Sequence, residues 1–361
     1  MKQQLQTGII MTLVIIGILL AFVLLYALMP LLLLVVIAVV FTTGIDPLVQ
    51  KLQRLRLGKH NLSRALATII VMFVAVFIFL GIFAMLVVTA FNESMIFARD
   101  TWPAARAHLL HWATNLSTHY PFIPKPAIVY TRLNAQSGQI ITYLWSTTQT
   151  VFSVIGGLFS VLTVFILTLF FTIFKDGICY NLAQFIPSRY QPRALEVSHM
   201  AAQRMGGWLR GQLTLALIIS SLAMLGMTFL RVHYAVLIGI VAGLGELIPM
   251  VGGYLGLIPA LIIILVASPF IWARVIAVVV FFILMMQLEN YYLGPKVMQH
   301  NAGLPPVTTI LALLTGGTLL GILGALLAIP LTAAGRVIML EAVFPAIQGK
   351  SREEIELGRP E

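Results

Sequence analysis

The stretch ALATIIVMFVAVFIFLGIFAMLVVTAF, residues 65–91, contains no Asp, Glu, Lys or Arg. It exceeds the roughly 20 residues that an α-helix needs to cross about 30 Å of hydrocarbon. Residues 150–174 are also free of charged side chains and are long enough to cross. Both stretches predict transmembrane helices, and the chain is therefore predicted to be an all-α polytopic membrane protein.

The composition supports this class. Of the 361 residues, 60% are hydrophobic and only 9% are charged, and the mean hydropathy is +1.01, far from the balance of a soluble domain. The formal charge of +10 does not predict a nucleic acid partner, because the basic residues lie in short loops beside apolar spans. Their expected role is to orient the chain in a lipid bilayer. With Cys179 alone, neither an intrachain disulfide nor a cysteine metal cluster is expected.

The basic loop KLQRLRLGKHNLSR, residues 51–64, is the densest in the chain, and the positive-inside rule places it in the cytoplasm. Residues 8–28 are interpreted as a retained anchor. They lack the small-residue cleavage site of a signal peptide, and Pro30 leads directly into further apolar sequence. Residues 8–50 are then expected to cross twice, which also places the N-terminus in the cytoplasm.

The segment between the two uncharged stretches contains the turn-rich YPFIPKP and several tryptophans. We interpret it as a folded extracytoplasmic cap, with a substrate-capturing domain as the alternative. The expected organisation is three transmembrane helices in residues 1–91, this extracytoplasmic segment over 92–149, a transmembrane helix and a cytoplasmic amphipathic segment over 150–211, a transport core over 212–345, and a cytoplasmic tail over 346–361.

Two apolar segments, residues 235–267 and 304–338, are interrupted by glycine and proline. If each is a re-entrant hairpin, Lys296 and the basic tail both lie in the cytoplasm; if each crosses once, Lys296 moves outside. Charge mildly favours the hairpins, which gives about eight membrane segments. GYLGLIPA (253–260) and GALLAIPL (324–331) share a Gly, a Leu and an Ile-Pro pair, so an inverted repeat, as in secondary transporters, is a further possibility.

GELIPMVGG, residues 245–253, places Glu246 inside the first interrupted segment. Non-helical backbone at membrane depth must be surrounded by protein or a water-filled cavity, so Glu246 is expected to face one of these. There it could exchange protons or coordinate a cation during transport. The alternative is that it caps the following helix or binds Arg210. The break predicts a polar passage or gate lined by Glu246 together with Pro249, Gly252, Gly253 and Pro259.

QLENYYLGPK, residues 287–296, carries a second acidic candidate at the end of a crossing. An amide beside a carboxylate can coordinate a cation or hydrogen-bond a hydroxylated solute, which gives Glu289 and Asn290 a possible transport role. The alternative is an interfacial ion pair between Glu289 and Lys296.

WLRGQ, residues 208–212, places Arg210 and Gln212 at the cytoplasmic mouth of the next span. Snorkelling of the basic side chain to the interface is the default explanation, and contact with substrate is the alternative. Asp46 is expected to pair with Lys51 or to lie at the interface, and Pro47 is expected to end the straight helix there.

Enzymatic function is not predicted. The sequence has no HExxH, GxSxG, Walker A or GxGxxG motif, and its histidines do not show ligand spacing. Neither a cofactor nor a metal is therefore expected. Without a nucleotide site, transport would use an ion gradient or the solute's own gradient.

Four motifs in order resemble the autoinducer-2 exporter family of bacterial permeases: WLRGQ (208–212), GLGELIPMVGGYLGLIPA (243–260), LENYYLGPKVMQHNAGLPP (288–306) and GILGALLAIPLTAA (321–334). The resemblance covers nearly the whole chain, and its specificity lies in the ordered set. It implies a multi-pass protein of the bacterial inner membrane with cytoplasmic termini that forms a homo-oligomer, with a pentamer as the expected form.

The resemblance also implies a function. The expected activity is export of a small polar solute such as autoinducer-2, a quorum-sensing signal, and a sodium/proton antiporter is the runner-up. A non-transporting membrane scaffold is the alternative from another class. One departure is visible: where relatives often have Leu-His-Pro, this chain has Leu304-Pro305-Pro306. The residues carried over are Arg210, Gly211, Gln212, Pro249, Gly252, Pro259, Glu289, Asn290, Pro295, Gly321, Gly324 and Pro330.

Overall fold

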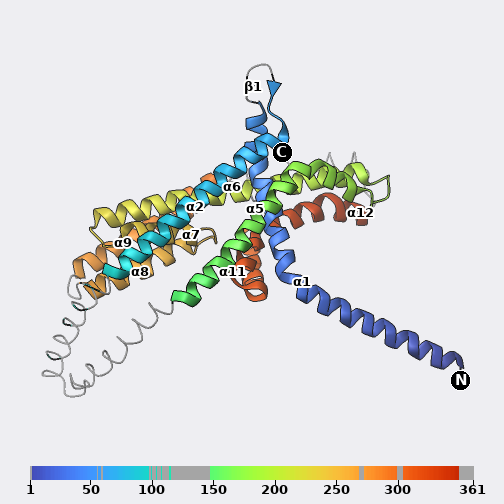
Figure 1. Cartoon of the computed structure of the whole chain (residues 1–361), viewed down its shortest axis with the longest axis horizontal. Helices are drawn as coiled ribbons and strands as arrows, with labels where there is room; N and C mark the ends of the chain where they lie inside the picture. The colour runs from blue at the N-terminus through green and yellow to red at the C-terminus, as the bar shows by residue number, and fades with distance from the viewer. Residues whose placement is uncertain are drawn as a thin grey trace.

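The computed structural model describes residues 2–54, 56–57, 60–96, 99, 103, 107, 114, 147–267, 272–298 and 304–348. Nearly all of them lie in helices, which confirms the all-α class (Figure 1). The expected extracytoplasmic segment, residues 92–149, and the expected tail, residues 346–361, lie largely outside the described residues. The elements are α1 (Lys2–Arg54), β1 (Arg56–Leu57), β2 (His60–Asn61), α2 (Arg64–Ile96), α5 (Thr147–Ala183), α6 (Gln191–Phe229), α7 (Ala235–Gly245), α8 (Gly252–Ala267), α9 (Trp272–Leu288), the π-helix η2 (Glu289–Leu293), α10 (Gly294–Met298), α11 (Pro306–Ile338), the π-helix η3 (Met339–Val343) and α12 (Phe344–Gln348).

Six helical stretches of the described chain are long and apolar enough to cross a membrane. Two more helices are apolar but short: α7 has 11 residues and α8 has 16. At about 1.5 Å per residue, each is shorter than the roughly 30 Å of a hydrocarbon core. The six long stretches are Ile10–Arg54, Arg64–Thr89, Gly157–Ala183, Gln191–Phe229, Trp272–Met298 and Val307–Val343.

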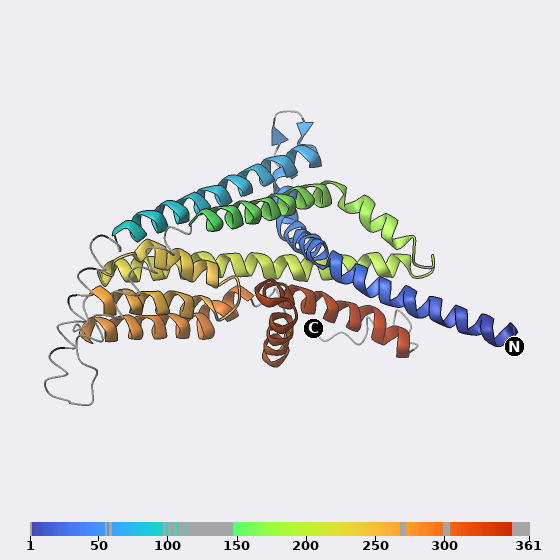
Figure 2. The ribbon, with the colours of Figure 1, turned by 60° about the horizontal axis from the view of Figure 1, so that its bottom comes forward.

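The N-terminal region differs from the prediction. Residues 1–91 were expected to hold three helices, whereas the structure has two, because α1 is one continuous helix of 53 residues that includes Pro30 and Pro47. A proline inside a helix removes one backbone hydrogen bond and bends the helix, but reversing the chain needs turn residues, which the apolar sequence around Pro30 lacks. Pro47 likewise does not end the helix, which continues to Arg54. The first half of α1 extends away from the other helices (Figures 1 and 2).

The remaining helices pack in layers around α6. Figure 2 shows α6 and α7 between a layer formed by α2 and α5 and a layer formed by α8 and α9. One buried apolar core joins α6 to α7, α8 and α9 around Phe282 and Ile219. A second core joins α6 to α1 and α11 around Trp208 and Leu327. Because α6 contributes to both cores, it connects the N-terminal helices to the region that contains the interrupted segments.

The first interrupted segment is a helical hairpin formed by α7, a turn over residues 246–251, and α8. Two of its glycines lie inside a helix and do not interrupt it. Gly239 and Gly243 lie one turn apart on α7 and face α6. A Cβ on Gly239 would lie 2.9 Å from the Ser220 carbonyl oxygen, and one on Gly243 would lie 2.5 Å from the Ser220 Cβ. Small residues at this spacing allow two membrane helices to approach closely.

The second interrupted segment lies within α11, which is broken at Gly321 by a backbone conformation of φ 63° and ψ −145°. This region of φ and ψ is accessible essentially only to glycine. The two halves of α11 then meet at Gly316 and Gly324: a Cβ on either residue would collide with the carbonyl oxygen of the other. Each interrupted segment thus contains one backbone break followed by a close contact at glycine.

Candidate functional site

Three polar side chains from separate parts of the chain are buried together near the turn of the α7–α8 hairpin. They are Gln212 of α6 and Glu246 of the turn, each 1% exposed, and Glu289 of η2, which is 6% exposed. Gln212 donates from Nε2 to the backbone carbonyl oxygen of Glu246. The carboxyl groups of Glu246 and Glu289 lie within hydrogen-bonding reach of each other. The structure thus joins three of the residues that the sequence singled out; we call them the buried acidic site.

Glu246 is held by the end of one helix and the beginning of the next. Its backbone N–H donates to the Ala242 carbonyl at 3.0 Å, which completes α7. Its carboxylate lies beside Gly252, the first residue of α8, where a Cβ would lie 2.5 Å from Glu246 Oε2. A helix N-terminus favours negative charge, because its first N–H groups have no partner within the helix. The carboxylate therefore lies beside the beginning of α8, the position that a capping role would require, and near Glu289.

Glu289 owes its position to a local widening of the helix that follows α9. Pro295 has no N–H to donate to the residue four positions earlier, and the helix before it changes to π-type bonding, in which the Gly294 N–H donates to the Glu289 carbonyl. A second π-helix, η3, also ends directly before a proline-containing segment, Phe344–Gln348. π-Bulges occur frequently at functional sites, where they reorient side chains.

The buried acidic site contains hydrogen-bond acceptors that lack donors. Gln212 Oε1 and Glu246 Oε2 are buried without a hydrogen-bond partner, and no salt bridge within the described parts of the chain reaches Glu246 or Glu289. Two carboxylates in contact away from water cannot both remain charged without a compensating proton or cation. The arrangement is therefore suited to holding a proton or a small cation.

Glycines of α8 create the space for this site. A Cβ on Gly252 would lie 2.5 Å from Glu246 Oε2 and 2.6 Å from the Ala242 carbonyl oxygen. A Cβ on Gly253 would lie 2.6 Å from the Met286 side chain of α9. These glycines allow α7, α8 and α9 to approach closely enough for Glu246 and Glu289 to meet.

The other predicted residues lie elsewhere. Asn290 is exposed, so the structure does not place it beside Glu246 with Glu289. Pro249 is half-buried in the hairpin turn, and Pro259 lies inside α8. Lys296 donates to the Tyr292 hydroxyl at 3.1 Å, and no ion pair with Glu289 is seen among the described residues. Arg210 faces α1 rather than Glu246.

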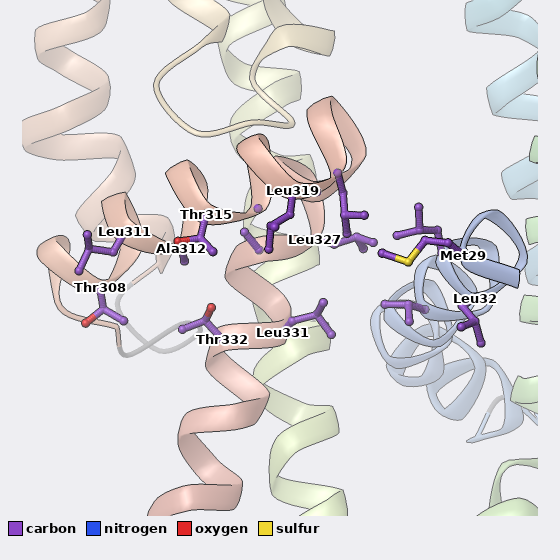
Figure 3. Close-up of a pocket in the computed structure, with 16 residues that line it drawn as sticks. Met29, Leu32, Thr308, Leu311, Ala312, Thr315, Leu319, Leu327, Leu331 and Thr332 are labelled. Atoms are coloured by element: carbon purple, nitrogen blue, oxygen red, sulfur yellow. The ribbon is translucent and has the colours of Figure 1, made fainter. Parts of the chain in front are cut away.

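The hairpin of α11 borders a separate feature, an open groove of about 610 Å³ between α11 and α1 (Figure 3). Gly324 lines it, whereas Gly321 and Pro330 do not. The lining is mainly leucine and other apolar side chains, with the hydroxyls of Thr308, Thr315 and Thr332. An apolar groove of this kind does not suit a small polar solute, and none of its lining residues belongs to the buried acidic site.

An ion network between α1, α2 and α5 corrects the expectation for Asp46. Asp46 is 5% exposed and pairs with Arg64 at 3.1 Å and Lys175 at 2.7 Å, not with Lys51. Arg64 also bonds Asp176 at 2.7 Å. These partners are far from Asp46 in sequence, so no local pattern could predict them. The network holds three helices together at one end of the molecule.

The chain is a multi-pass α-helical membrane protein with a buried acidic site beside a broken helix. The model of the family described as AI-2E family transporter matches residues 10–344, and the chain belongs to this family. It is a multi-pass membrane protein of that family.

Individual relatives agree with this assignment. YueF of Bacillus subtilis is 28% identical over 222 residues, 59% of each chain. YrrI of the same organism is 32% identical over 154 residues, 43% of each chain. YhhT of Escherichia coli is 24% identical over 306 residues, 84% of this chain and 82% of that protein. Each carries the name "putative transport protein". The chain thus spans about half the length of YueF and YrrI, and most of YhhT.

Proposed function

We propose that this protein is a permease that moves a small polar solute, with autoinducer-2 as the candidate, out of the cell. The buried acidic site couples this movement to an ion. The observation that carries the proposal is the contact between Glu246 and Glu289, buried without a basic partner among the described residues. Loss or gain of a proton or cation there changes the repulsion between the two carboxylates.

That change would act directly on the α7–α8 hairpin. Glu246 belongs to the turn, its backbone is bonded by Gln212 of α6, and its carboxylate contacts both α8 and η2. Separation of the two acids would therefore move the turn relative to α6 and α9. In secondary transporters, sites of this kind lie between discontinuous helices near the bilayer midplane.

A second candidate within transport is a sodium/proton antiporter. It is favoured by the two buried acceptor oxygens, Gln212 Oε1 and Glu246 Oε2, that lack donors. Oxygen atoms of carboxylates and amides are the ligands that hard cations prefer. In this case the ion itself is the transported species, and Glu246 and Glu289 bind it.

The membrane arrangement is part of the same proposal. The chain would lie in the bacterial inner membrane with both termini in the cytoplasm, and both interrupted segments would be re-entrant. The shortness of α7 supports a hairpin that enters and leaves on one side. A homo-oligomer, with a pentamer as the expected form, would cover part of the exposed apolar surface of α1, where the large apolar side chains from Ile10 to Leu25 are all more than half exposed.

The test is flux into liposomes that contain the purified full chain, with autoinducer-2 and, separately, with sodium under an imposed pH gradient. Wild type is compared with Glu246→Gln and with Asp176→Asn, which removes a carboxylate that is 73% exposed. Solute flux lost only in Glu246→Gln supports the coupled exporter. Sodium-driven proton movement without solute flux supports the antiporter.

The scaffold alternative gives a different result. If neither autoinducer-2 nor sodium moves, and deletion within residues 92–149 abolishes the cellular phenotype while Glu246→Gln preserves it, the transport proposal is refuted.

A further inference from the structure

Helices α1 and α6 touch backbone to backbone at one crossing. A Cβ on Gly206 of α6 would collide with the Thr43 carbonyl oxygen of α1. A Cβ on Gly44 of α1 would lie 2.6 Å from Leu209 Cδ2 of α6. The absence of side chains at both glycines therefore allows the Thr43 carbonyl to point directly at α6.

The Thr43 carbonyl is available because of Pro47. In an α-helix the N–H of the residue four positions later would bond this carbonyl, and proline has no N–H. Arg210 lies one turn after Gly206 on α6, and its Nη1 donates to the Thr43 oxygen at 3.4 Å and to the Gly44 oxygen at 3.3 Å. A carbonyl at a helix crossing that loses its donor is costly unless another donor replaces it.

We infer that Arg210 is a positioning residue that replaces the donor removed by Pro47 and so fixes α6 against α1. Its effect reaches the buried acidic site through α6 itself. Gln212 follows Arg210 by two residues in a helix that is continuous from Gln191 to Phe229, so both side chains move with the same rigid element. A shift of α6 by one residue would move Gln212 by about 1.5 Å along the axis and about 100° around it, which would remove its bond to the Glu246 carbonyl.

This role differs from the two that the sequence suggested for Arg210, snorkelling and substrate contact. A snorkelling side chain would extend into the interface, and a substrate ligand would face the buried acidic site. Arg210 instead is half-buried against backbone carbonyls of α1. The inference uses the site of the proposed function, but it concerns only the resting structure, so it is tested without measuring transport.

The test is hydrogen–deuterium exchange of the full chain in detergent micelles, read in peptides that cover residues 41–50 and 244–252. We expect Arg210→Ala to speed exchange roughly tenfold in both peptides, because loss of hydrogen bonds from a charged donor makes local opening easier. Pro47→Ala gives residue 47 an N–H, so the double variant Pro47→Ala/Arg210→Ala should return both peptides to within about twofold of Pro47→Ala alone. Arg189→Ala, which removes an exposed arginine, should change neither peptide.

Each outcome supports or overturns one step. If residues 244–252 exchange at the wild-type rate in Arg210→Ala, Arg210 does not position the hairpin. If the double variant exchanges as fast as Arg210→Ala, Arg210 does not act by bonding the carbonyl that Pro47 leaves free. If Arg210→Ala yields no folded protein, recovery of folding in the double variant supports the inference, and failure of both overturns it. The flux measurement tests the proposed function separately, because hydrogen–deuterium exchange alone decides the role of Arg210.

Discussion

Replacement of Gly252 by alanine tests the geometry of the buried acidic site most directly. The added Cβ would lie 2.5 Å from Glu246 Oε2, 2.6 Å from the Ala242 carbonyl oxygen and 2.8 Å from the Glu246 backbone nitrogen. Carbon does not approach these atoms so closely. Two of the three are backbone atoms, so a change of rotamer cannot relieve the contact, and α7 and α8 must separate.

The expected magnitude follows from two opposing effects. Alanine is favoured over glycine in a helix by about 0.5–1 kcal/mol. Overpacking of a close-packed interior costs about 1–3 kcal/mol, and more where the backbone must shift. Since the contact involves the backbone, we expect Gly252→Ala to lower the free energy of unfolding by about 1–2 kcal/mol in total. The Glu246 carboxylate is displaced in the same step, so flux should fall as well.

The assay is equilibrium unfolding in mixed detergent micelles, followed by far-ultraviolet circular dichroism. Gly335→Ala is the matched control, because Gly335 lies in α11 and a Cβ there would meet nothing within 4 Å. It should raise the free energy of unfolding by about 0.5–1 kcal/mol. If Gly252→Ala is as stable as Gly335→Ala and transports normally, α7 and α8 do not pack closely around Glu246, and the reasoning is refuted.

Three further substitutions test other contacts. Gly321→Ala should lower the free energy of unfolding by about 1–3 kcal/mol, because φ is 63° there. Gly317→Ala should raise it by about 0.5–1 kcal/mol, as for Gly335→Ala, since its Cβ would meet only one side chain at 4.0 Å. Thermal unfolding should separate the two variants. Asp46→Asn should lower the free energy of chemical unfolding by about 3 kcal/mol, because it leaves two partly buried basic side chains without their acidic partner. Asp176→Asn removes a carboxylate that is 73% exposed and should lower it by only about 0–1 kcal/mol. Equal effects of the two substitutions would refute the ion network. Gly243→Val should separate α6 from α7 and increase protease sensitivity of the hairpin, and unchanged sensitivity would contradict the close crossing.

Local sequence was informative where a structural feature depends on neighbouring residues. Uncharged apolar runs such as residues 65–91 predicted helices, because a helix satisfies its own backbone within one segment. Glycine and proline marked both interrupted segments, because these residues change the allowed backbone conformations. The break at Gly321 is a case in which one residue type permits one local geometry.

The same signals were ambiguous where a residue has two possible uses. Residues 8–50 were expected to cross twice, but they lie within the single helix α1, and no turn residues accompany Pro30. Gly239 and Gly243 lie in an interrupted segment, but they form the crossing of α7 with α6 instead of a break. A signal was present in their spacing of one helical turn, which is typical of close helix contacts in membranes.

The sequence by itself therefore determined the class of protein, the helical segments after residue 64 and the acidic residues placed where lipid excludes charge. It did so because hydrophobicity and backbone preference act over short distances along the chain. Only the tertiary structure decided that Gln212, Glu246 and Glu289 form one site, that Arg210 bonds the carbonyl freed by Pro47, and that Asp46 pairs with α2 and α5. These contacts join residues far apart in sequence, so they depend on how helices pack against one another, which no local pattern encodes.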